Sequence, residues 1–167
     1  MREDSTIKMA SCGEAWVARL EGRGTVRESP TLQGLATRIL EARGDACVLL
    51  DLRGCEYLDS TFLGCIATLH RRFSAGRPQR FRIVAPEPVR ARLFGPSGLD
   101  RVFAFAEAAP EPDADAWMDV PATALDERQL GYHVMEAHRR LAELGGPHAL
   151  AFAAIAEQFA LELGAKP

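Results

Sequence analysis

The sequence is poor in the residues that build metal sites and disulfide frameworks, and it has no long apolar run. Four cysteines and four histidines occur among 167 residues, and no run of about 18 apolar residues is long enough for a membrane-spanning helix. The first four residues, Met1 to Asp4, lack the basic and then apolar pattern of a signal peptide. We therefore expect a cytoplasmic protein without a membrane span.

The spacing of the cysteines and histidines argues against a metal or redox site. The cysteines are 35, 8 and 10 residues apart, and these separations match no paired spacing of such a site. His133 and His138 are five residues apart, so they do not share a helix face as ligands at i and i+4 would. We expect no metal and no cofactor, and we interpret the cysteines as small buried apolar residues. They are Cys12, Cys47, Cys55 and Cys65.

Motifs of common enzymes are absent as well. There is no Gly-x-Ser-x-Gly motif, and Gly22-Arg23-Gly24 lacks the Gly-Lys-Ser/Thr continuation of a phosphate loop. We expect no catalytic residues and no enzyme. What the chain does have is 47% apolar and 26% charged residues with a net charge of −3, the composition of an ordinary globular protein.

Charge divides the chain into two parts. Residues 1–110 carry 16 Lys+Arg against 13 Asp+Glu, whereas residues 111–167 carry 4 against 10. Three prolines and several acidic residues lie between the two parts, a composition typical of a connector rather than of a core element. We predict one domain over residues 1–106, a connector over 107–122 and a helical unit over 123–167.

Arginines are concentrated in residues 71–101, where the local charge is +6. The overall acidity and the lack of interleaved aromatic residues argue against nucleic-acid binding. A solvated face remains one interpretation, and contact with the acidic C-terminal part is another. These arginines are Arg71, Arg72, Arg77, Arg80, Arg82, Arg90, Arg92 and Arg101.

Strand-like and helix-like stretches alternate before the connector. Stretches at 6–10 and 15–21, with Gly13 between them, predict a hairpin, and helical spacing predicts a helix from Ser29 to Gly44. The apolar run 46–52 predicts a strand buried on both faces. A turn with Gly54 and Glu56 follows.

The rest of the first part predicts further crossovers. A helix begins at residues 59–60 and ends near Gly76, and a strand at 81–85, a helix at 86–99 and a last strand at 102–105 follow. Strands separated by helices imply crossover connections, hence a mixed sheet with helices packed against it. The predicted class is α/β or α+β.

The C-terminal part predicts an antiparallel helical hairpin. Its first helix begins near Thr123, with Asp126 in a capping-box position, and ends at Gly145-Gly146-Pro147; its second covers 148–163. A lone hairpin cannot bury its apolar stripe, so it must pack on the first part or on another chain, and a homodimer is one possibility. The predicted inward face of the second helix consists of Phe152, Ile155, Phe159 and Leu163.

Ser60 stands out as a candidate for phosphate chemistry. A serine that enters a helix places its hydroxyl beside unpaired backbone N–H groups and the positive end of the helix dipole, where a phosphate is well held. The alternative is structural, because Ser60 or the neighbouring Asp59 can simply cap the helix.

One family combines these features. The strand CVLLDLRGCEYL, the junction Asp59-Ser60-Thr61-Phe62-Leu63-Gly64 and the later segment FRIVAPEPVRARLFGPSGLDRVF together resemble a STAS domain. This family comprises the bacterial anti-sigma factor antagonists and cytoplasmic domains of sulfate transporters. The resemblance covers residues 5–106 and implies a mixed sheet of four or five strands with helices mainly on one face.

The resemblance also implies a function. Ser60 matches the serine that a partner-switching kinase phosphorylates, Asp59 matches the acidic residue that shapes the recognition site, and Thr61 is a secondary acceptor. With Phe62 and Gly64 these residues would form the partner-binding surface. The protein would bind an anti-sigma factor that is also a serine kinase, and phosphorylation would end that binding by adding about −1.5 to −2 charge.

Two departures from the family pattern leave alternatives open. Phe62 stands where the family has glycine, so it either narrows access for the kinase, acts as a docking anchor, or points into the core. The C-terminal hairpin lies beyond the end of the minimal family member. A second hypothesis is therefore a non-phosphorylated interaction or scaffold module in a signalling or transporter assembly. No group of residues points to a third hypothesis, a small-molecule sensor.

Overall fold

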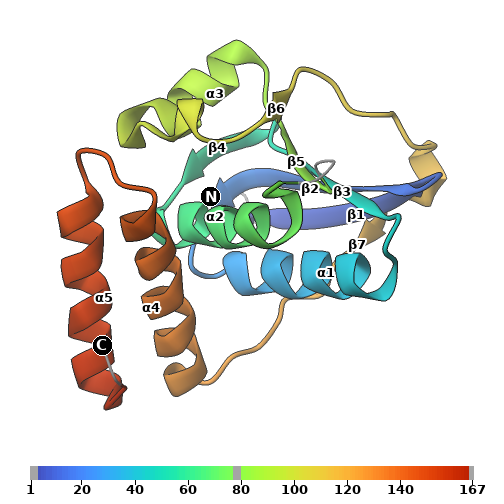
Figure 1. The fold of residues 1–167 in the computed structure, drawn as a ribbon. Helices are drawn as coiled ribbons and strands as arrows, with labels where there is room; N and C mark the ends of the chain where they lie inside the picture. The colour runs from blue at the N-terminus through green and yellow to red at the C-terminus, as the bar shows by residue number, and fades with distance from the viewer. Residues whose placement is uncertain (1–3, 77–79, 166–167) are drawn as a thin grey trace.

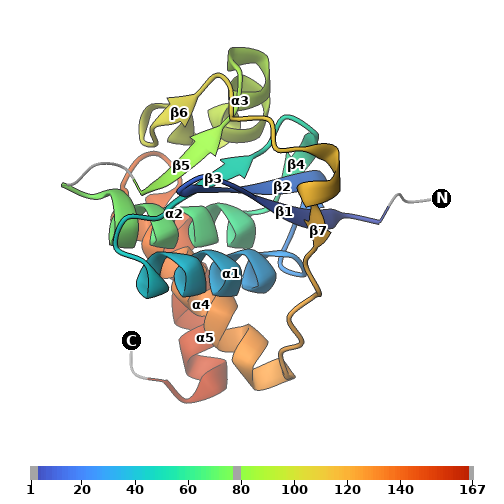
Figure 2. The same cartoon turned by 90° about the vertical axis from the view of Figure 1, so that its right-hand side faces the viewer.

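A seven-stranded mixed sheet forms the centre of the protein. In the view of Figure 1, helices lie below the sheet, another helix lies above it and a helical pair lies at one end (Figures 1 and 2). The computed structural model describes residues 4–76 and 80–165. The strand order is β6-β5-β3-β2-β1-β7, and β4 pairs with β2. The predicted class, a mixed sheet plus a C-terminal helical pair, is confirmed.

The predicted N-terminal hairpin is present. β1 (Thr6–Cys12) and β2 (Ala15–Gly24) pair antiparallel, and Gly13 between them has φ 66°, a conformation that glycine adopts without strain. The central strand β3 (Cys47–Asp51) pairs parallel with β2 on one side and with β5 (Phe81–Val84) on the other.

Three short strands raise the count above the predicted four or five. β4 (Cys55–Leu58) occupies the predicted turn and pairs with β2, whereas β6 (Phe105–Ala106) and β7 (Met118–Asp119) extend the two edges of the sheet. The predicted strand at 102–105 is thus wrong by several residues, because a 3₁₀ turn, Leu99–Arg101, precedes it.

Helices α1 (Ser29–Ala42) and α2 (Ser60–Ser74) lie side by side on one face of the sheet, as Figure 2 shows. Helix α3 (Glu87–Phe94) ends five residues before the predicted Leu99. It gives way to 3₁₀ turns around Gly98, whose φ of 73° ends the right-handed path.

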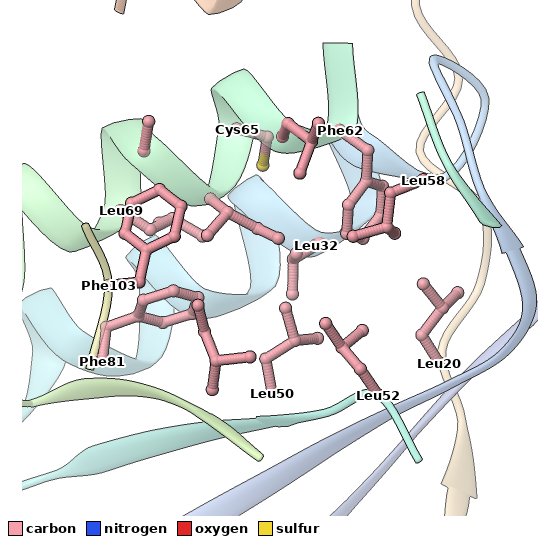
Figure 3. Packing of buried hydrophobic residues seen from close by; sticks show 14 of the residues in the cluster. Leu20, Leu32, Leu50, Leu52, Leu58, Phe62, Cys65, Leu69, Phe81 and Phe103 are labelled. Carbon is pink, nitrogen blue, oxygen red and sulfur yellow. The ribbon is translucent and has the colours of Figure 1, made fainter. Parts of the chain in front are cut away.

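The main core lies between the sheet and these two helices (Figure 3). Val48 and Leu50 of β3, and Leu52 directly after it, point toward the helices, whereas Leu49 points to the opposite face. All four are buried, so the prediction of a strand buried on both faces is confirmed.

The opposite face of the sheet is covered by part of the predicted connector. Val17, Leu49 and Val84 form a small second cluster against Ala109 and Trp117. The connector therefore contributes a strand and an apolar anchor to the sheet, because its scattered apolar residues find a place there that composition alone does not indicate.

An ion-pair network fastens this segment. Buried Asp51 accepts hydrogen bonds from Arg19 at 3.0 Å and from Arg53 at 2.9 Å, and Arg53 also pairs with Glu111 at 2.9 Å. Burial opposes ionisation of Asp51, but the bonds from Arg53 and Arg19 outweigh it, so its pKa is below the usual range. Arg19 also lies over the ring of Trp117.

The C-terminal hairpin consists of α4 (Glu127–Glu143) and α5 (Ala149–Leu163). Asp126 and Gln129 form the predicted capping box, although α4 begins four residues after Thr123. Ile155 of α5 is 38% exposed rather than inward, because the helix turns Ala156 and Ala160 toward α4.

Candidate functional site

The start of α2 is organised by Asp59. Its carboxylate accepts hydrogen bonds from the backbone N–H groups of Phe62 and Val26, both at 2.8 Å, and so ties the helix start to the loop before α1. Asp59 is therefore the helix cap, and the alternative that Ser60 is the cap is wrong. The Ser60 hydroxyl is left available for another contact.

Phe62 points into the core, which decides between its three interpretations. Its side chain is fully buried and lies beside Leu58 in Figure 3. Gly24 makes the room for it, because a Cβ at Gly24 would lie 3.0 Å from the Phe62 ring and 2.5 Å from Leu58. A fully buried ring cannot be a docking anchor in this structure.

The Ser60 hydroxyl meets a histidine of the C-terminal hairpin. Its Oγ lies 2.9 Å from Nε2 of His138, and Nδ1 of the same ring lies 2.7 Å from the backbone carbonyl oxygen of Val134. Since a carbonyl oxygen only accepts, Nδ1 carries the proton, and in the neutral ring Nε2 is the acceptor. Ser60 therefore donates to His138, which is 3% exposed.

A second serine makes the matching contact at the start of α1. The Oγ of Ser29 lies 2.7 Å from Nε2 of His133, one and a half turns before His138 on α4. Burial lowers the pKa of His133 below its ordinary value, and the negative charge of Asp59 partly opposes this shift. Two helix starts are thus joined to α4 by serine–histidine pairs.

Gly64 lies directly under α4. A Cβ added there would lie 2.3 Å from the backbone oxygen of Ala137 and 2.7 Å from its Cα. The two helix backbones therefore approach so closely that only glycine fits at position 64 without a shift.

The residues of the predicted junction therefore lie in two environments, the interior of the domain and the contact with α4. Asp59 caps α2, Thr61 and Phe62 are buried at 5% and 0% exposure, and Ser60 and Gly64 contact α4. The roles of Ser29, His133, Ala137 and His138 were not predicted. The sequence signal for these contacts is the pair of histidines, which lie close to the apolar stripe of α4.

The arginine-rich stretch does not form one open basic surface. Arg71 pairs with Glu143 of α4, Arg72 with Glu41, and Arg92 with the backbone oxygen of Cys55. Arg80 donates to three backbone carbonyl groups around the end of α1, and Arg77 lies outside the described residues. The predicted contact with the acidic C-terminal part is confirmed at Arg71.

Few features of the described residues suit other ligands. No group of three histidine, cysteine or acidic side chains in residues 4–76 and 80–165 could hold a metal ion, and no helix in these ranges is long and apolar enough to cross a membrane. Cys55 and Cys65 are buried as expected, but Cys12 and Cys47 are only partly buried, since both lie at an end of their strands.

Comparison with known proteins gives a likeness in fold. No family model and no curated protein matches the sequence. The crystal structure of an anti-sigma factor antagonist from Mycobacterium paratuberculosis matches with a TM-score of 0.51 and 21% identity over 63% of this chain and 87% of that one.

The anti-sigma factor antagonist SpoIIAA in its unphosphorylated form matches with a TM-score of 0.46 and 16% identity over 64% of this chain and 90% of that one. The likeness to the mycobacterial protein establishes a shared fold, and the fold that the resemblance to a STAS domain implied is thereby confirmed. More than a third of the present chain lies outside that match.

Proposed function

We propose that this protein is an anti-sigma factor antagonist of a partner-switching pathway, which binds an anti-sigma factor with serine kinase activity and is released by phosphorylation at Ser60. The observation that carries the proposal is the start of α2. Asp59 provides the cap there, so the Ser60 hydroxyl is not needed to begin the helix. The shared fold with an antagonist supports the same role.

The electrostatics of the junction fit a switch. Asp59 already places one negative charge beside Ser60, and a phosphate would add about −1.5 to −2 more at the same point. Such a change repels an acidic partner surface and opposes desolvation of the contact. In this role the protein is a binder and a kinase substrate, and it needs no catalytic residues of its own.

Peptide mass spectrometry of the protein from its native cells, grown with and without stress, tests the proposal. We expect phosphate on Ser60 whose occupancy changes with growth condition and which is absent from a Ser60→Ala variant. Ser29→Ala is the matched control, because Ser29 makes the same kind of contact with α4 but is 0% exposed. That variant should keep the phosphate on Ser60.

Partner binding gives a second readout. The unmodified protein should retain a kinase-fold anti-sigma factor on affinity purification, and a Ser60→Asp variant should retain at least tenfold less. Absence of phosphate from Ser60 and Thr61 under every condition would contradict the switch.

One observation favours the alternative of a non-switching interaction module. The Ser60 hydroxyl is already hydrogen-bonded to His138, so the serine has a structural use that joins α2 to the hairpin. In that case partner binding would persist unchanged in Ser60→Asp, and no phosphate would be found.

A further inference from the structure

Helix α4 of the hairpin lies across the starts of α1 and α2. Figure 1 shows it beside the first turns of α2, and its side chains reach both helices. His138 meets Ser60, His133 meets Ser29, and Ala137 between them meets Gly64. The residue proposed to accept phosphate is therefore in contact with the protein's own C-terminal unit.

The contact occupies the hydroxyl of Ser60, which is itself partly buried, and covers the helix surface next to it. The Ser60 hydroxyl donates to a ring that is 3% exposed. One turn along α2, the backbone of Ala137 occupies the space against Gly64, at 2.3 Å from where a Cβ would lie. A kinase must enclose the acceptor hydroxyl, and a protein partner must touch this helix surface, so both need α4 to move away from it first.

Several contacts in this interface are nevertheless polar and tolerate water. Two serine–histidine hydrogen bonds and the Arg71–Glu143 ion pair connect α4 to α1 and α2. Each of these polar groups finds water when the helices separate, so the net free energy of each bond is modest. Leu141 supplies a buried apolar contact to the main core.

We propose that the C-terminal hairpin is an intramolecular cover, which withholds Ser60 and the surface around Gly64 until α4 leaves the starts of α1 and α2. That the cover controls phosphorylation rests on the proposed function, in which Ser60 accepts the phosphate. The cover itself is a property of the structure and is tested without a kinase.

The test measures access to position 60 with a thiol reagent. A Ser60→Cys variant of the full chain is treated with N-ethylmaleimide, and modification is followed peptide by peptide. In this background Ala137→Arg places a long charged side chain at a position that is 3% exposed and whose backbone contacts Gly64. Ala154→Arg places the same side chain on the exposed face of α5. The second variant is the matched control.

Cys65 provides an internal measure of unfolding. It is fully buried in the main core, with its thiol against the backbone oxygen of Ser29, and burial raises its thiol pKa. Release of the cover should therefore expose the thiol introduced at position 60 and leave Cys65 protected. If Ala137→Arg proves too disruptive to fold, Ala137→Val against Ala154→Val repeats the comparison with two added methyl groups.

We expect the thiol at position 60 to react at least tenfold faster in Ala137→Arg than in Ala154→Arg, with Cys65 slow in both. Equal rates at position 60, within twofold, would overturn the cover. A matching increase in the labelling rate of Cys65 in both Ala137 variants would also overturn the cover. It would show that moving the hairpin opens the core of the sheet domain as well.

Phosphate occupancy then separates the cover from the proposed function. In native cells Ala137→Arg should carry several times more phosphate on Ser60 than Ala154→Arg. Fast labelling of the thiol at position 60, without phosphate on Ser60 in any variant that retains the serine, would support the cover and contradict the proposed function. Phosphate at equal levels in both variants would support the proposed function and contradict the cover.

Discussion

Helix α2 has two faces that are built in different ways. Toward the sheet it presents Phe62, Cys65, Ile66 and Leu69, all buried at 0–1% exposure in one apolar cluster. Toward α4 it presents the hydroxyl of Ser60, the small residue Gly64 and the charge of Arg71. Large apolar side chains lose much on exposure to water, whereas small and polar groups lose little. We call the contact of α2 with the sheet the permanent interface, and its contact with α4 through Ser60, Gly64 and Arg71 the opening interface.

The largest effect is expected in the permanent interface. Phe62→Ala removes a fully buried ring and should lower the free energy of unfolding of the sheet domain by about 3–5 kcal/mol. Urea denaturation measures this loss. Leu150→Ala, at a position 87% exposed, should change stability by less than about 0.5 kcal/mol. If Phe62→Ala lowered the free energy of unfolding by no more than Leu150→Ala, the sheet-facing side of α2 would not be the core of the domain.

A smaller effect, confined to the hairpin, is expected at Gly64. Gly64→Ala forces α4 away from α2 because its Cβ meets the backbone of Ala137, and it should weaken docking of α4 by about 1–3 kcal/mol. Hydrogen exchange should show faster exchange in α4 and unchanged exchange in β3.

The control for Gly64 is another helical glycine. A Cβ at Gly34 of α1 meets nothing within 4 Å, so Gly34→Ala should stabilise the protein by about 0.5–1 kcal/mol. Exchange that rises equally in α4 and β3 of Gly64→Ala would contradict the separation between the two interfaces.

A single polar contact across the opening interface should contribute less. A double-mutant cycle of Ser60→Ala with His138→Phe should give a coupling energy of about 0.5–1.5 kcal/mol, the range of one hydrogen bond. The cycle of Ser60→Ala with His133→Phe should be additive, because His133 bonds Ser29 instead. Equal couplings in the two cycles would mean that the hydrogen bond is not the source of the effect.

The smallest effect is expected from pH. Burial lowers the pKa of His133 from 6.5, so the released helix binds a proton more readily than the docked one. Docking of α4 should therefore be strongest above pH 6.5 and weaken as the pH falls below that value. The Gly64 amide resonance in NMR spectra reports docking. His133→Gln should remove the pH dependence, and a dependence that survives this change would have to come from another group.

The sequence predicted the permanent interface well because it follows from local pattern. The apolar run around Leu50 and the helical spacing of Leu63, Ile66 and Leu69 each indicate a buried face, and the structure buries all of them. The position of Asp126 before a helical stretch indicated a cap, whereas the start of α2 left two candidates, Ser60 and Asp59, of which the structure selects Asp59.

The opening interface was not predictable in the same way. Its contacts join Ser60 to His138 and Ser29 to His133, across 78 and 104 residues, and no local pattern records such a pairing. Gly64 was recognised as part of a motif, but the close approach of Ala137 that requires glycine is visible only in three dimensions. The same holds for β7, two residues whose pairing with β1 depends on the path of the connector.

The segment between β7 and α4 also sets how the hairpin competes with other molecules. The backbone N–H of Val120 bonds the carbonyl oxygen of Ile7, and that of Thr123 bonds the hydroxyl of Thr31, so the chain is held to the domain until shortly before Asp126. A short tether of this kind gives the attached helix an effective concentration on the order of millimolar at its docking surface. A molecule in solution that competes for the start of α2 therefore faces a resident competitor at that concentration, and even weak docking of α4 reduces its apparent affinity.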